Sequence, residues 1–213
     1  MHKIIGTFMI ASFGFGSVIA AQAGQDEAIS KDLDCRDDFS QTLYLDLESA
    51  ERYYSGSARY VTSKRCAKRA ARALNQYRDL NPDNNTERLI SAEAYLRGVS
   101  GQNDTAITLL KEAITKHERP LSDDDMGEDY MDHAALAFLE RDFDKLKALR
   151  MRLANLPMPD YYKDALPKMR EISPYIDHSF PPSLFIIDAY VDCYERGFYN
   201  AFTLCEGNRL SFL

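Results

Sequence analysis

The spacing of apolar residues is the feature that most constrains what this chain can fold into. From about residue 37 onward, apolar side chains recur every three or four positions, which is the period of an α-helix, whereas the alternation typical of strands is almost absent. Ala, Leu, Glu, Lys and Arg dominate these stretches and favour helices, while Gly and Pro fall mostly between them. The sequence therefore predicts an all-α protein of stacked antiparallel helical hairpins, arranged as an α-solenoid or a compact bundle.

The turn-forming residues divide the chain into a series of expected helices. These cover residues 37–54, 59–79, 86–98, 105–116, 122–141, 144–155, 161–172, 181–196 and 198–205. Thr86 is the expected N-cap of the third helix, since its hydroxyl can accept from a free backbone N–H. Gly197 separates the last two helices and is expected to turn the chain back.

The first 23 residues have the layout of a secretory signal peptide. A short positive start at 1–3 precedes an apolar run from Ile4 to Ala20, and Ala21-Gln22-Ala23 then supplies small residues for cleavage. The alternative is an uncleaved membrane anchor, because the run is about long enough to span a bilayer. We expect cleavage, a polar arm over residues 24–34, and a single helical domain over residues 35–213.

Charge limits the partners of the exported chain. Loss of the signal peptide takes the formal net charge from −7 to −8, because Lys3 is its only charged residue. Nucleic-acid binding requires clustered cations against phosphates, so an acidic chain of this kind argues against it. After signal removal no membrane span is expected, since the most apolar stretch, Leu184–Ile187, is followed at once by Asp188.

Four cysteines in an exported chain predict two disulfide bonds. No two cysteines have the C-x2-C spacing of a zinc site. Three pairings are possible, and we favour Cys35–Cys66 and Cys193–Cys205. Two antiparallel helices meeting near Gly197 would bring Cys193 and Cys205 almost level, whereas one continuous helix would separate them by about 18 Å.

One segment resembles the second half of a tetratricopeptide repeat. Its pattern is Gly101-x-Asn103-x-x-Ala106-Ile107-x-x-Leu110-x-x-Ala113-Ile114, followed by Pro120. The match covers about 30 residues, and it departs from the family in its longer repeat spacing, its lack of Trp and the Arg97 that stands where a Tyr is usual. The resemblance implies helix pairs stacked in an arc, with a concave face that binds peptides or protein segments.

The sequence carries little that points to catalysis, a metal or a cofactor. There is no G-x-S-x-G elbow, no phosphate-binding loop and no dinucleotide fingerprint. The acidic run at 123–129 does not match the register of an EF-hand. Asp129 and His133 are four residues apart and would share one helix face, but a third ligand is missing from that face.

A basic stretch from Arg59 to Arg78 contains no acidic residue, and its candidate partner-binding side chains share one helix face. The predicted binding residues are Arg65, Lys68, Arg69 and Arg72, together with Tyr95 and Arg97. The functional interpretation is an anionic partner. The alternative, which we favour from sequence, is pairing with the first helix through Asp46, Glu48 and Glu51.

Taken with the predicted export, these features favour a module that binds a protein or peptide as a scaffold or adaptor, in a bacterial periplasm or outside the cell, with no cofactor. Two alternatives remain. One is an envelope hydrolase or metal-dependent enzyme of unrecognised family. The other is a periplasmic inhibitor or immunity protein, for which the Met126–Asp129 loop is the candidate contact.

The signal-peptide hypothesis makes a direct prediction. We expect the exported protein to begin at or near Gly24, because the small residues at 21 and 23 precede it. N-terminal sequencing of the exported protein measures this. Recovery of Met1 in a membrane fraction would instead show an uncleaved anchor.

Overall fold

The computed structural model describes Cys35 and residues 39–55, 63–116, 121, 128–172 and 178–205. Contacts divide the chain into two units, Met1–Arg36 and Asp37–Leu213. Every described residue other than Cys35 belongs to the second unit. The predicted signal peptide and the whole of the predicted polar arm, residues 24–34, lie outside the described residues.

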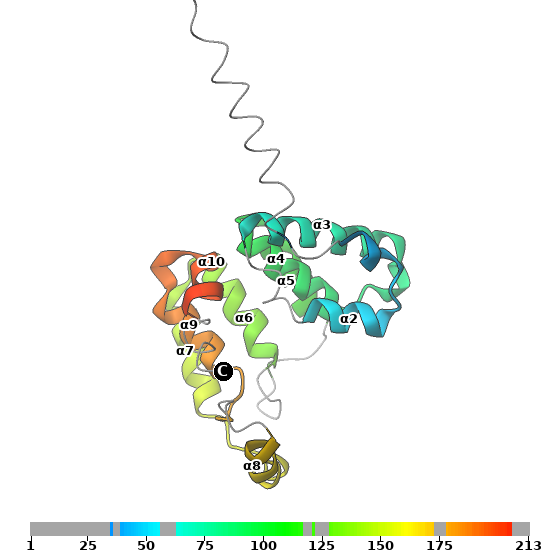
Figure 1. The fold of residues 1–213 in the computed structure, drawn as a ribbon. Helices are drawn as coiled ribbons and strands as arrows, with labels where there is room; N and C mark the ends of the chain where they lie inside the picture. Colours follow the sequence, from blue (N-terminus) through cyan, green and yellow to red (C-terminus); the bar gives the residue numbers. More distant parts are fainter. Residues whose placement is uncertain are drawn as a thin grey trace, which may run out of the picture. The chain divides into compact units, whose positions relative to one another are not determined.

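The described residues are helical and contain no strand, so the predicted all-α class is confirmed (Figure 1). The elements are η1 (Phe39–Tyr44), α2 (Leu47–Ser55), α3 (Lys64–Leu80), η3 (Pro82–Asn84), α4 (Glu87–Val99), α5 (Asn103–Lys116), α6 (Glu128–Leu139), α7 (Phe143–Ala154), α8 (Asp160–Ile172), α9 (Leu184–Asp192), η4 (Tyr194–Arg196), α10 (Phe198–Asn200) and η5 (Ala201–Cys205). Within these segments, no helix combines the length and the apolarity needed to cross a bilayer.

The first predicted helix, over residues 37–54, is wrong as a single helix. The chain forms the 3-10 helix η1 and then the α-helix α2, with a break at Leu45–Asp46. The carboxylate of Asp46 accepts from the Ser49 backbone N–H at 2.8 Å, as the cap of a new helix does. Apolar residues of both helices nevertheless face inward, since Phe39, Ala50 and Tyr54 are all buried.

Helix α3 begins later than predicted, at Lys64 rather than Arg59. Ser63 has extended backbone angles, and its hydroxyl accepts from the Cys66 N–H at 3.2 Å, so it is the N-cap. One face of α3 consists of small side chains and two large ones, all buried: Cys66, Ala67, Ala70, Ala71, Ala73, Leu74 and Tyr77. Small residues allow neighbouring helices to approach closely, and α3 packs on α4 and on η1.

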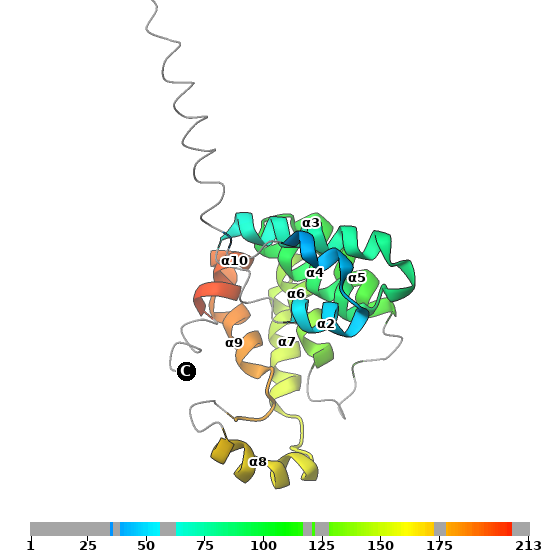
Figure 2. The ribbon, with the colours of Figure 1, turned by 45° about the vertical axis from the view of Figure 1, so that its right-hand side comes forward.

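Helices α3, α4 and α5 form the first stack, and they lie side by side in both Figures 1 and 2. Thr86 caps α4 as predicted, since its hydroxyl accepts from the Leu89 N–H. Between α4 and α5, Gly101 turns the chain at φ 85°, a conformation that favours glycine. The α4–α5 hairpin is the segment that resembles a tetratricopeptide repeat, and its two helices make the most extensive contact in the protein.

The later helices extend this stack. Helix α6 packs on α5 and α7, and α9 packs on α6 and α7. Helix α8 lies beyond the end of α7 in Figures 1 and 2. Its one buried residue, Tyr162, has its ring 5.1 Å from that of Phe180, measured between centroids.

The C-terminal segment turns at Gly197, which has φ 82°, as predicted. Phe198 begins α10 and is 4% exposed. Its ring centroid lies 5.5 Å from that of Phe138 and 5.4 Å from that of Tyr190. Gly98 of α4 lies against the same ring, so the absence of a side chain there allows α10 to dock on α4.

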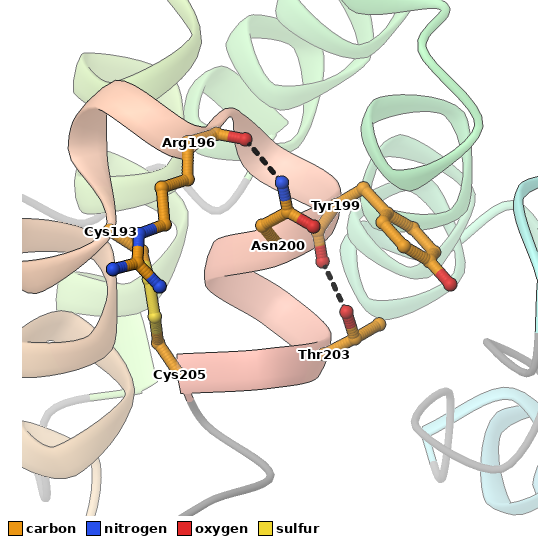
Figure 3. Close-up of a disulfide and its surroundings, with 6 residues drawn as sticks. All are labelled: Cys193, Arg196, Tyr199, Asn200, Thr203 and Cys205. Atoms are coloured by element: carbon orange, nitrogen blue, oxygen red, sulfur yellow. Dashed lines mark hydrogen bonds between the residues drawn. A yellow bond between two sulfur atoms is a disulfide. The ribbon is translucent and has the colours of Figure 1, made fainter.

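The predicted Cys193–Cys205 disulfide bond is confirmed. Cys193 and Cys205 are bonded, with their Cα atoms 6.4 Å apart, because the turn at Gly197 brings the two segments level (Figure 3). Cys35 and Cys66 are also disulfide-bonded, and none of the four cysteines is free, as two disulfide bonds require.

The contact between Gly98 and Phe198 can be tested by adding one methyl group. In Gly98→Ala the new Cβ would lie 2.9 Å from Cδ1 of Phe198, whose ring is held by other rings and cannot retreat. We expect the free energy of unfolding to fall by about 1–3 kcal/mol because of overpacking, despite the higher helix propensity of Ala. Urea unfolding measures it. In a Phe198→Ala background the same substitution should not lower the stability further. An equal loss of stability in both backgrounds would show that the contact between Gly98 and Phe198 is not the cause.

Candidate functional site

The cations of α3 lie on the face opposite its alanines. Because the alanine face is buried, the remaining side chains of the first turns must point outward. Lys64, Lys68, Arg69 and Arg72 are exposed, and Arg65 is half-buried. We call these five residues the basic face. Arg59, which the sequence placed on the same stretch, lies outside the described residues.

The predicted pairing of this face with the first helix is wrong, because the acids of that region have other partners. Glu48 pairs with Arg52 on its own helix. The Ser49 backbone N–H bonds to Asp46 and holds the pKa of that carboxyl below its usual value. Glu51 accepts from the Thr86 hydroxyl at 2.7 Å. Among the described residues, none forms an ion pair with the basic face.

Nine other cations of the described segments do form ion pairs. Ion pairs engage Arg52, Arg78, Arg88, Arg97, Lys111, Arg141, Lys147, Arg150 and Lys163. The contrast is clearest on α3 itself. Arg78, less than two turns beyond Arg72, pairs with Glu93 at 2.6 Å.

Glu93 is a buried carboxylate held by two arginines. It is 1% exposed, and it accepts from Arg78 of α3 and, at 2.9 Å, from Arg97 of its own helix. Arg78 also donates to Asn85 at 2.7 Å, and Arg97 to Gln102 at 3.1 Å. These bonds join α3 and α4 and fix both arginines inside the helical stack. Arg97 therefore has an internal role here.

Tyr95, the other predicted binding residue on α4, also has internal contacts. Its hydroxyl donates to Asp132 of α6 at 3.0 Å, and its ring stacks on that of Phe198 and lies tilted against that of Phe202. The structure thus separates the six predicted binding residues into two groups. Four belong to the basic face, while Tyr95 and Arg97 connect helices.

Tyr199 is a neighbour of the basic face that the sequence did not indicate. The ammonium of Lys64 lies 5.4 Å from the centroid of the Tyr199 ring, within the range of a cation–π contact. Tyr199 belongs to α10 and is partly exposed. The Phe198-Tyr199 doublet after Gly197 was visible in the sequence, but nothing local could reveal that the chain returns to the start of α3.

The paired Asp129 and His133 do not extend to a metal site within the described segments, where no group of three metal-ligating side chains occurs. Burial lowers the pKa of His133, and Lys145 lowers it further, against an opposing effect of Asp129. Of the Met126–Asp129 loop considered for an inhibitor, Met126 and Gly127 lie outside the described residues, and Glu128 and Asp129 belong to the first turn of α6.

No family model, curated protein or solved structure matches this chain. The resemblance to tetratricopeptide repeats stays a prediction. The site is therefore interpreted from its own geometry.

The buried Glu93 cluster yields a stability prediction. Glu93→Gln removes the charge that two largely buried guanidinium groups share, and we expect a loss of about 3–5 kcal/mol in the free energy of unfolding. Glu48→Gln is the matched control, since that side chain is 83% exposed and its ion pair should contribute less than about 1 kcal/mol. Chemical denaturation of both variants measures the difference. Similar losses of stability in the two variants would show that the buried Glu93 cluster contributes no more to stability than an exposed ion pair does.

Proposed function

We propose that this chain is an exported helical module that binds a protein partner, and that its basic face recognises an acidic segment of that partner. The observation that carries the proposal is a group of five cations within nine residues of α3, four of them exposed and Arg65 half-buried, without an ion-pair partner among the described residues. The chain as a whole is acidic, with a net charge of −7. A segment rich in Asp or Glu is the complementary ligand, and arginines suit it because they bind carboxylates through two parallel hydrogen bonds.

The placement of these charges works against the stability of α3. A helix favours acidic residues in its first turn, yet Lys64 and Arg65 stand there and no acid does. Lys68 and Arg72 follow at positions where like charges repel their neighbours by roughly 0.2–0.5 kcal/mol per pair. This arrangement of like charges does not stabilise the helix itself. It favours the binding of an anionic ligand, because the ligand relieves the repulsion between the cations.

A peptide suits this face better than a membrane or a nucleic acid does. From Lys64 to Arg72 the face is only about 12 Å long at 1.5 Å per residue, which is short for duplex nucleic acid. Membrane-surface helices insert an apolar face into lipid, whereas the apolar face of α3 is buried against α4 and η1. The net negative charge of the chain also opposes approach to anionic lipids.

Export is supported by the two disulfide bonds, which persist in oxidising compartments and are rare in the cytosol. A bacterial periplasm or the extracellular medium would provide such conditions. The stacked helical hairpins support the scaffold or adaptor role, since helical-repeat proteins present helix faces to extended protein segments.

The proposal predicts that charge removal separates binding from stability. In Lys68→Gln/Arg72→Gln, we expect stability to be unchanged or raised by up to about 1 kcal/mol, because like-charge repulsion falls. Binding of a peptide with four consecutive glutamates should weaken at least ten-fold, as measured by fluorescence anisotropy. Binding to the unaltered protein should also weaken as salt rises.

Lys147→Gln/Lys163→Gln is the matched control, because it removes the same charge from two cations that pair within their own helices. It should leave peptide binding unchanged. A second peptide with glutamines in place of the glutamates should not bind. Equal weakening by both double variants would mean that net charge alone matters, and the basic face would not be the site.

A further inference from the structure

The basic face continues beyond α3 onto the C-terminal segment. Lys64, the first residue of α3, lies over the ring of Tyr199 from α10. In Figures 1 and 2, α10 lies next to the N-terminal end of α3. One end of the cationic row therefore meets a partly exposed aromatic side chain, whereas the other end, after Arg72, continues into polar residues.

The position of Tyr199 is set by its neighbours on both sides. Phe198 is buried among aromatic rings, which anchors α10, and the Thr203 hydroxyl donates to the Tyr199 carbonyl at 2.7 Å. The Cys193–Cys205 bond closes the loop that contains these residues. Figure 3 shows the Tyr199 ring on the side of this helical segment away from the disulfide. The side chain that points outward is thus carried by a segment fixed at both ends.

We infer that Tyr199 determines specificity in this surface, and that the preferred ligand is an acidic peptide with an aromatic side chain next to its acidic residues. This inference rests on the proposed function of the basic face. The acids would bind Arg65, Lys68 and Arg72, and the aromatic side chain would contact the Tyr199 ring at the Lys64 end. The disulfide holds Tyr199 in position and does not itself touch the ligand.

The chemistry of the two groups is complementary. The attraction between the cations of α3 and the carboxylates of a peptide is screened by salt. Many acidic segments would bind through this attraction alone, so it provides little specificity. A tyrosine offers apolar area with little conformational entropy to lose, and an aromatic pair adds an attraction beyond burial of area. Since the aromatic residue is at one end only, it would also fix the direction in which the peptide lies along α3.

The test compares three peptides on the full chain: four glutamates alone, the same with a phenylalanine before them, and the same with a phenylalanine after them. We expect one of the two aromatic peptides to bind about two- to ten-fold more tightly than the plain acidic one. Tyr199→Ala should remove that gain, so that the aromatic and plain peptides bind this variant equally tightly. Tyr161→Ala is the matched control, because it removes a 59% exposed tyrosine from α8, and it should preserve the gain.

A Cys193→Ser/Cys205→Ser variant tests the positioning role of the disulfide. In this variant, the additional affinity for the aromatic peptide should decrease towards zero, as in Tyr199→Ala, while the plain acidic peptide still binds to α3. If neither aromatic peptide binds more tightly, or if the gain survives Tyr199→Ala, this inference is wrong and the proposed function stands. If the plain acidic peptide does not bind the unaltered protein, the proposed function itself is wrong.

Discussion

The buried alanine face of α3 is the constraint on which the arrangement of charges depends. Four alanines with at most 8% exposure let α3 lie close to α4 and to η1. A helix packed so closely on one side has no room there for a lysine or arginine. Every cation of its first two turns must therefore point to the opposite side, and the basic face is the geometric consequence of a small-residue core.

The same helix shows how burial decides what a charge does. Arg78 is near the end of α3, where the helix faces Glu93, and its guanidinium is held by an almost completely buried carboxylate. Arg72 lies less than two turns earlier, is exposed, and forms no ion pair among the described residues. Two arginines of one helix thus have different roles: Arg78 joins α3 to α4, and Arg72 faces outward.

The sequence predicted the features that follow from local chemistry. The apolar period predicted helices, the Thr86 cap was placed correctly, and the turn at Gly197 predicted that Cys193 and Cys205 would meet. Errors arose where two local signals compete. Asp46 lies within an unbroken apolar period, yet its side chain caps the next helix, so the predicted helix divides there.

Other features depend on contacts between segments that are distant in the sequence, and no local sequence pattern predicts such contacts. The acids near the start of the chain looked suitable for α3, but Glu51 bonds to Thr86 on α4. Tyr199 is more than 130 residues from Lys64 in sequence and yet lies beneath it. The basic face itself was recognisable from spacing, whereas its lack of partners required knowing where each acid of the described fold is bound.

The close fit of Phe198 against Gly98 connects the core to the candidate surface. A larger residue at Gly98 would displace the Phe198 ring, and with it the segment that places Tyr199 beside Lys64. The contact does not take part in binding, but it sets the distance between the two elements that form the surface. The cations could attract an acidic segment without α10. A defined aromatic neighbour requires the glycine on α4, the buried ring of Phe198 and the disulfide that closes the C-terminal loop.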